Sequence, residues 1–243
     1  MIYFFDGSKE AFLTAFLEAY PDEEAFLTST QKQLTIGQES VFVQADDRRA
    51  AKAERRFLQL DKNCLSDLSV LLRSGQDGHE QIAFRYLRKL ARAGRPVRRM
   101  LADEDVVAAV ECMNRVRFEI HRLHGFIRFM ESASGALYAP FSPDNDVCDL
   151  LVPHFRARLP QFPFVLHDVS RKKAAIYDGK NTFVAPLERA EVVLSADEQG
   201  WQALWKRYYA SVNIPSRERL KQMRSYMPVR YWKFLPEKIA PTD

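Results

Sequence analysis

The sequence predicts an α+β fold in which an antiparallel sheet with an inserted helix is flanked by N- and C-terminal helices. Apolar residues recur at helical spacing in the first half, the period changes to the alternation of strands after Gly125, and a helix-start signal returns at Ser195. Helices on both sides of a run of short strands are typical of α+β domains.

The N-terminal part, residues 1–100, is predicted to be mainly helical. Ser8 can cap a first helix, which Pro21 ends, and Asp46 can begin a second helix whose later turns are basic, as the helix dipole favours. The other elements expected here are strands over 2–5 and 41–44 and helices over 65–72 and 79–93. The last helix carries a basic stripe opposite its apolar face, made of Arg85, Arg88, Lys89 and Arg92.

The middle part, residues 101–190, is predicted to form a long helix and then the antiparallel sheet. An apolar stripe from Val106 to Leu123 defines the helix, and Gly125 is expected at its C-terminal cap. The expected strands cover 126–131, 136–141, 164–169, 174–177 and 182–185, and the inserted helix covers 146–158.

The C-terminal part, residues 191–243, is predicted to be helical again. Ser195 and Glu198 have the spacing of a capping box, and most of the tryptophans are expected in the core. A basic helix with Arg217, Lys221 and Arg224 should follow. Because no repeat or long linker interrupts the chain, residues 1–243 are expected to form a single α+β domain, in which any boundary would fall near 94–102.

The charge of the chain is mildly basic and unevenly distributed. Lysine and arginine total 36 against 32 acids, a formal net charge of +4. Residues 1–24 contain six acids and one lysine, whereas residues 85–99 contain seven basic residues and no acid. Such asymmetry indicates an anionic partner more than the net charge does.

The three cysteines, Cys64, Cys112 and Cys148, lie far apart and lack the spacing of a disulfide framework or a metal site. A reducing, cytoplasmic location is therefore expected, with no metal and no other cofactor. No apolar run approaches membrane-spanning length, so no contact with a membrane is expected.

Four of the five histidines lie in three short segments that also contain arginine. They supply the candidate catalytic residues His121, His154, His167 and Asp168. Histidine titrates near neutral pH and can transfer protons, but a lone histidine on an apolar helical face is more often a core residue. Strand alternation places His167 and Asp168 on opposite faces, which disfavours a direct dyad.

Cations beside these histidines are candidates for binding phosphate. Arg128 should share a strand face with apolar residues and needs a partner, either a ligand or an acid such as Glu119 or Asp168. Residues 171–173, Arg-Lys-Lys, occupy a tight connection that could hold a phosphate or could be an ordinary solvated turn.

Two other kinds of site have less support from the sequence. The pair His121 and His124 has a spacing that could bind a metal, with Asp144 and Asp146 nearby in sequence, but no established metal motif is present. The chain also has no Gly-x-Ser-x-Gly sequence and no glycine-rich phosphate loop.

Nucleic acid is the ligand that the sequence favours, because cations neutralise phosphates and aromatic rings stack on unpaired bases. Basic stripes recur on several expected helices, and aromatics adjoin cations at 155–156, 207–209 and 230–233. The alternative is that these stripes only keep the helices soluble. The residues predicted to contact nucleic acid are Arg122, Arg128, Arg158, Arg171, Lys172, Lys173, Tyr231 and Trp232.

The sequence resembles a bacterial family described as a probable DNA metabolism protein, a domain of unknown function. The residues that carry the resemblance run over nearly the whole length: Asp6-Gly7-Ser8, Glu119, His121-Arg122, Gly125-Phe126, Arg128-Phe129, Tyr138-Ala139, Pro143-Asp144, Asp146, His154-Phe155, Arg158, His167-Asp168, Arg171, Pro228, Arg230-Tyr231-Trp232 and Pro236-Glu237. Leu159 and Leu123-His124 depart from the family pattern, which argues against a strong role for His124.

The resemblance implies a role in DNA modification or repair. Members of the family are encoded beside a putative DNA-repair radical SAM protein, and some are fused to a uracil-DNA glycosylase domain. Because this chain lacks a three-cysteine cluster, the resemblance implies that it is the companion of such an enzyme.

Three functional hypotheses follow from the sequence. The first is a DNA metabolism or repair protein that binds nucleic acid and acts with a radical SAM or glycosylase partner. The second is a DNA-processing enzyme with a His/Arg/Asp site, in which His167 and Asp168 transfer protons and Arg128 and Arg171 bind phosphate. The third is a protein-interaction adaptor whose basic stripes contact acidic surfaces.

Overall fold

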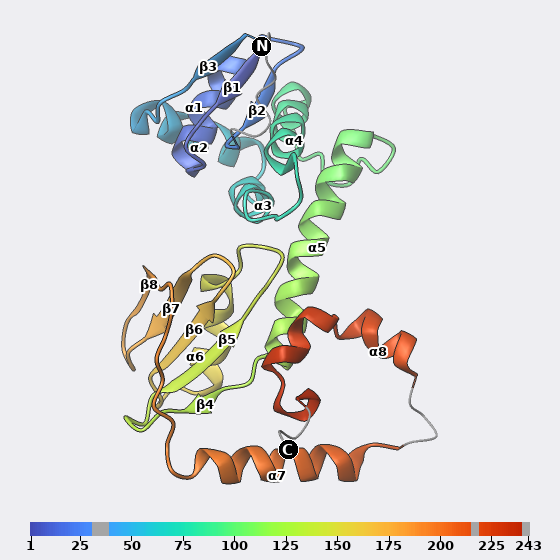
Figure 1. Cartoon of the computed structure of the whole chain (residues 1–243). Coiled ribbons are helices and arrows are strands. Elements are labelled where there is room, and N and C mark those ends of the chain that lie inside the picture. The colour runs from blue at the N-terminus through green and yellow to red at the C-terminus, as the bar shows by residue number, and fades with distance from the viewer. Residues whose placement is uncertain (31–38, 215–218, 240–243) are drawn as a thin grey trace. The chain divides into compact units, whose positions relative to one another are not determined.

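The computed structural model of the protein describes residues 1–30, 39–214 and 219–239 and has a mixed α+β fold (Figure 1). The chain forms two compact units, Met1–Arg117 and Phe118–Asp243. They divide within one helix, α5 (Glu104–Phe126), and not near residues 94–102. The number of independently folding domains stays a prediction. Within the described ranges, no helix is both long and apolar enough to cross a membrane.

The first unit contains a small parallel sheet and several helices. The strand order is β2-β1-β3, and both pairs are parallel. The elements of this unit before α5 are β1 (Ile2–Phe4), α1 (Lys9–Ala19), β2 (Phe26–Thr28), β3 (Ser40–Phe42), α2 (Asp47–Leu60), α3 (Cys64–Leu71) and α4 (His79–Ala93). Apart from β2, each was expected from the sequence, with bounds that differ by a few residues at most.

Local signals in the sequence set the helix ends of this unit. Ser8 caps α1 by accepting a hydrogen bond from the amide of Ala11 at 3.2 Å. Asp46 caps α2 by accepting from two amides. Gly94, with φ +64°, ends α4 in the left-handed conformation that favours glycine. The predicted cap at Ser8 and the predicted start of a helix at Asp46 are therefore confirmed.

Aromatic rings form the centre of the first core. Phe16 makes edge contacts with Phe57 and Phe84 at centroid distances of 5.2 and 5.6 Å, and Phe5 contacts Phe12 in the same way. All five rings are buried. Edge contacts of this kind add to the hydrophobic stabilisation of the core.

Three of the four cations of the α4 stripe form ion pairs within this unit. Arg88 lies over the ring of Phe84 and donates to the carbonyl of Asp22 at 2.9 Å. Its neighbours on the stripe make ion pairs with acids from other segments: Lys89 with Asp103, Arg92 with Glu23, and Arg85 with Asp105. The uneven charge distribution of the sequence therefore reflects internal pairing at this helix.

The second unit is built on a five-stranded mixed sheet in the order β4-β5-β6-β7-β8. After the end of α5 its elements are β4 (Met130–Glu131), β5 (Leu137–Phe141), η2 (Asp149–Leu151), α6 (Val152–Arg158), β6 (Phe164–Asp168), β7 (Lys173–Tyr177), β8 (Thr182–Pro186), α7 (Glu198–Val212), α8 (Leu220–Tyr226), η4 (Val229–Phe234) and η5 (Pro236–Lys238). Phe155 of α6 packs on Phe164 of β6.

The expectation of an antiparallel sheet is wrong for one central pair of strands. β5 and β6 are parallel, with Ala139 opposite Leu166, whereas the other three pairs are antiparallel. The segment that contains α6 connects β5 to β6. A connection that holds a helix is long enough to return the chain to the starting edge of the sheet, which a tight hairpin cannot do.

The expected strand over 126–131 is much shorter in the structure. α5 continues to Phe126, so Gly125 lies within the helix and is not its cap. The amide of Ile127 still bonds to the carbonyl of Leu123 at 3.0 Å. Arg128 therefore lies between α5 and β4, outside any strand.

Two expectations for the C-terminal helices are also wrong. The predicted capping box is absent at α7, because the buried Glu198 carboxylate accepts from the amide of Glu131 at 2.8 Å and not from a capping position. Trp201 is 60% exposed, so the first tryptophan of α7 is not in the core. The predicted cation Arg217 lies outside the described residues.

Candidate nucleic-acid interface

His167 is a buried structural residue on β6. Tyr138 donates its hydroxyl hydrogen to Nδ1 at 2.6 Å, and Nε2 donates to the carbonyl of Leu187 at 2.9 Å. Both ring nitrogens are thus used inside the protein, and the ring is 2% exposed. This arrangement joins β5 and β6 to the segment after β8, and it leaves no nitrogen for a substrate.

Asp168 is equally enclosed at the end of β6. Its carboxylate accepts from Ser170 through both the amide and the hydroxyl, and from the Arg171 amide at 3.1 Å. The Arg171 guanidinium contacts the same carboxylate at 3.2 Å. Asp168 therefore shapes the turn that follows β6.

The predicted phosphate-binding turn, residues 171–173, is occupied by partners from the protein itself. Arg171 also donates to the carbonyls of Pro143 and Asp144. Lys172 makes an exposed ion pair with Glu188, and Lys173 pairs with Asp146. Binding of phosphate here would have to compete with these contacts.

Two histidines from different helices stack on each other. The rings of His124 on α5 and His154 on α6 have centroids 3.9 Å apart and are within 11° of parallel. The Nε2 atom of each ring is buried and has no hydrogen-bond partner among the described residues. Burial, followed by the charges of His154 and His121, lowers the pKa of His124 below its usual 6.5. His124 is therefore neutral at neutral pH.

His121 is exposed on α5 and His167 bonds to other partners, so no contact joins the four histidines into one cluster. Among the described residues there is also no group of three metal-binding side chains. Proton transfer by several histidines acting together has no geometric support.

Glu119, on the last part of α5, is a buried carboxylate that accepts five hydrogen bonds. Two come from backbone amides, of Asp144 and Asn145, and one comes from the Asn145 side chain. The others come from Arg230 at 2.8 Å and the Tyr231 hydroxyl at 2.7 Å. Burial alone would raise the pKa of Glu119, but these donors outweigh it and lower the pKa.

A second buried carboxylate, Glu237, holds the other end of the C-terminal segment. It accepts from Arg128 at 2.8 Å and from the indole of Trp205 at 2.8 Å, and the Arg128 guanidinium lies 4.9 Å from the Trp205 ring. Arg128 thus pairs with an acid of the protein and not with a ligand, which was one of the two alternatives that the sequence left open. The acid is Glu237, and not Glu119 or Asp168. Together the two carboxylates attach residues 230–237 to α5 and α7.

The other residues predicted to contact nucleic acid have different environments. Tyr231 is buried against Glu119, and Trp232 donates to the carbonyl of Met227 at 3.1 Å. Arg158 is exposed at the end of α6. Arg122 donates to the carbonyl of Ser225, which places it at the end of α8.

The C-terminal helices carry an excess of positive charge. Over the described residues 199–214 and 219–239 the only acid is Glu237, whose side chain is 2% exposed. The basic residues of these ranges are Lys206, Arg207, Arg219, Lys221, Arg224, Arg230, Lys233 and Lys238. Arg230 pairs with Glu119, whereas Lys233 and Lys238 lie over aromatic rings. The other five, Lys206, Arg207, Arg219, Lys221 and Arg224, make neither an ion pair nor a ring contact with a described residue; we call these the free cations. In the α4 stripe, by contrast, Arg85, Lys89 and Arg92 form ion pairs.

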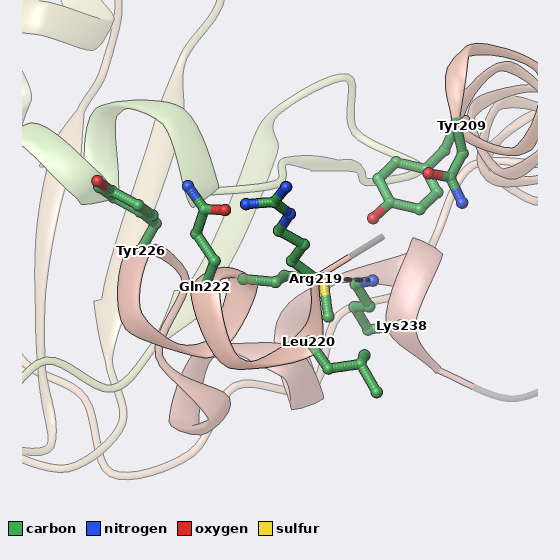
Figure 2. Close-up of a pocket in the computed structure, with 8 residues that line it drawn as sticks. Tyr209, Arg219, Leu220, Gln222, Tyr226 and Lys238 are labelled. Atoms are coloured by element: carbon green, nitrogen blue, oxygen red, sulfur yellow. Dashed lines mark hydrogen bonds between the residues drawn. The ribbon is translucent and has the colours of Figure 1, made fainter. Parts of the chain in front are cut away.

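A hollow of about 460 Å³ opens between α7 and α8 (Figure 2). Its lining residues are Tyr209, Asn213, Arg219, Leu220, Gln222, Met223, Tyr226 and Lys238. In Figure 2, Arg219, Gln222 and Tyr226 extend from the same side of α8, and Tyr209 lies at the opposite end of the hollow. The spacing of three and four residues places these α8 side chains on one helical face.

Lys238 is the lining residue of this hollow that comes from the C-terminal segment. Its ammonium lies 5.0 Å from the centre of the Tyr209 ring and 5.6 Å from that of Trp232, and it contacts the Met223 sulfur at 3.5 Å. These contacts connect the C-terminal segment to both helices. Glu119 bonds to Arg230 and Tyr231 of the same segment, and Glu237 of this segment bonds to Arg128 and Trp205.

A family model for a domain of unknown function, DUF4130, matches residues 77–237. The chain belongs to the DUF4130 family. The matched region contains both carboxylate clusters and every lining residue of the hollow except Lys238, and it excludes β1, β2 and β3. No curated protein and no solved structure matched the chain. The predicted resemblance to a domain of unknown function is thus confirmed, whereas the role in DNA metabolism stays a prediction.

Sequence reasoning missed the hollow itself. It noted Lys221, Arg224 and the run 207–209 as basic and aromatic, but it did not place Arg219, Gln222 or Tyr226 in a site. The signal that could have found them is the near absence of acids after Glu198, combined with Arg219, Gln222 and Tyr226 at helical spacing.

Proposed function

We propose that this protein binds single-stranded nucleic acid through its C-terminal helices. The observation that carries the proposal is the set of free cations on and next to α7 and α8, the helices on either side of a hollow lined by tyrosines, in a region where the one described acid is buried. Unpaired cations can neutralise phosphates, and aromatic rings in a hollow can stack on bases only when those bases are unpaired.

The test is the binding of a labelled oligothymidylate, measured by fluorescence anisotropy at several salt concentrations. The affinity should fall steeply with added salt, and a duplex of the same length should bind more weakly. Reversing two free cations, Lys221→Glu with Arg224→Glu, should weaken binding and reduce the salt slope by about 1.4, since each single-strand phosphate contact contributes about 0.7.

Lys180→Glu is the matched control, because Lys180 is an exposed lysine of the same unit at the turn between β7 and β8. It should leave binding within about twofold, as expected for a distant surface charge. Absence of binding at low salt, or equal effects of the control and the double variant, would show that the proposal is wrong.

The role in DNA metabolism or repair with a radical SAM or glycosylase partner rests on the sequence resemblance and forms part of this proposal. In that role the chain would hold a strand on which a partner acts. The enzyme hypothesis has less support, because His167 and Asp168 are buried and fully bonded. A partner that stays bound after nuclease treatment would favour the adaptor hypothesis instead.

A further inference from the structure

The α8 side of the hollow offers an aromatic ring that no other ring covers. Tyr226 is 66% exposed, and its side chain has no ring contact or hydrogen bond with a described residue. Tyr209, by contrast, has the Lys238 ammonium over its ring at 5.0 Å. Tyr226 is therefore the open stacking platform of the hollow.

The residues next to Tyr226 have the chemistry to recognise a base and its phosphate. Gln222 lies four residues before Tyr226, and its amide can donate and accept at the same time, as the edge of a nucleobase requires. Arg219 lies one turn further and has no carboxylate partner among the described residues. Both extend to the same side as Tyr226 (Figure 2).

The lining argues for a base and not for an isolated anion. A simple phosphate site needs cations and amide hydrogens, whereas this hollow adds two tyrosine rings and the amides of Asn213 and Gln222. Its volume of about 460 Å³ falls in the range of sites that hold small organic ligands.

We propose that the hollow holds one unpaired nucleobase, stacked on Tyr226, with Gln222 bonded to the edge of the base and Arg219 to the adjoining phosphate. This inference rests on the proposed function and specifies which part of the nucleic acid the site recognises.

The experiment compares an oligothymidylate with an oligonucleotide of the same length and backbone in which every base is replaced by a stable abasic residue. Both carry the same phosphates, so their difference reports contacts to bases. The wild-type protein should bind the thymidylate about tenfold more tightly, the size expected for a base stacked on an aromatic ring. Tyr226→Ala should remove this difference and leave the affinity for the abasic strand unchanged.

Two further variants serve as controls. Tyr226→Phe keeps the ring and should keep the preference. Tyr208→Ala removes a tyrosine that is similarly exposed on α7 but does not line the hollow, and it should also keep the preference. Because both tyrosines are exposed, loss of folding is not expected, and circular dichroism checks this.

The outcomes separate this inference from the proposed function. Equal binding of both strands by the wild-type protein would overturn the base site and leave nucleic-acid binding intact. Binding of neither strand would overturn both. Loss of the preference in Tyr208→Ala but not in Tyr226→Ala would place the base elsewhere and overturn the assignment to this hollow.

Discussion

At the scale of single residues, the conspicuous charged side chains of this protein are mostly structural. Glu119 and Glu237 each accept hydrogen bonds from an arginine and an aromatic residue, and Asp168 accepts from the turn that follows it. A buried carboxylate with several donors is stable only while every donor stays in place. These residues therefore position the C-terminal segment and the sheet.

Glu119→Gln tests this interpretation. The glutamine amide has the shape of the carboxylate but lacks the negative charge to which Arg230 and Tyr231 donate. Its NH₂ group would also face donors and not acceptors. We expect the free energy of unfolding to fall by about 3 kcal/mol, as for other broken buried pairs, measured by urea denaturation of the full chain.

The same substitution at an exposed pair is the comparison. Glu188→Gln removes the partner of Lys172, where both side chains are more than half exposed. Its effect should stay within about 0.5 kcal/mol, as is usual for surface ion pairs. A loss below about 1 kcal/mol for Glu119→Gln would mean that the carboxylate is not a main support of this unit.

At the scale of elements, the histidine pair connects α5 and α6. Both rings also make edge contacts with Phe155, which packs on β6. A proton on His124 would place a charge in a buried position beside the His154 ring. The contact between these helices therefore depends on the charge of His124 and so on pH.

The pKa of His124 is below 6.5 in the folded protein because of burial and the neighbouring histidines, so the unfolded chain takes up the proton more readily. Stability should be complete above about pH 6.5 and fall as the pH decreases toward the folded pKa. Urea midpoints at pH 8 and pH 5.5 measure this fall. His124→Phe keeps a ring on His154 without a titrating group and should lose less; an equal loss in both proteins would contradict the explanation.

The helix α7 forms where the sequence predicts a helix, but many of its large apolar side chains are exposed. Its residues alternate at helical spacing, yet Trp201, Leu204, Tyr208 and Val212 are all more than half exposed. Trp205 instead points to Glu237. The periodicity of a sequence identifies a helix, but the location of the core decides which face of the helix is buried.

At the scale of the whole molecule, positive charge is distributed in two ways. The cations of α4 pair with acids such as Glu23 and Asp103, whereas the free cations of the C-terminal helices have no such partners among the described residues. Paired charges contribute little to attraction at a distance, so long-range attraction of an anion should come mainly from the C-terminal helices.

The single-domain prediction can be tested through α5, which contributes Val106 and Met113 to the core of the first unit and Leu123 to the buried residues of the second. A continuous helix should couple their unfolding, so calorimetry of the wild-type protein should show one transition. Phe118 lies at the division and is 64% exposed. Phe118→Pro, which breaks a helix at a cost of about 3 kcal/mol, should split the transition in two.

Phe118→Ala is the control for this experiment, because it removes the same exposed ring and keeps the helix. It should unfold in one transition. Two transitions in the wild-type protein would show that the units unfold independently and that the single-domain prediction is wrong.

The sequence alone determined where most elements begin and end, because caps, glycines and apolar periods act over a few residues; Ser8, Asp46 and Gly94 are examples. Only the tertiary structure decided the parallel pairing of β5 with β6, the exposed face of α7 and the partner of Arg128. These depend on segments that lie far apart in the chain. The candidate site follows the same division. Its cations and aromatics could be read from the sequence, but only the tertiary structure brings residues of α7, α8 and the C-terminal segment together around one hollow.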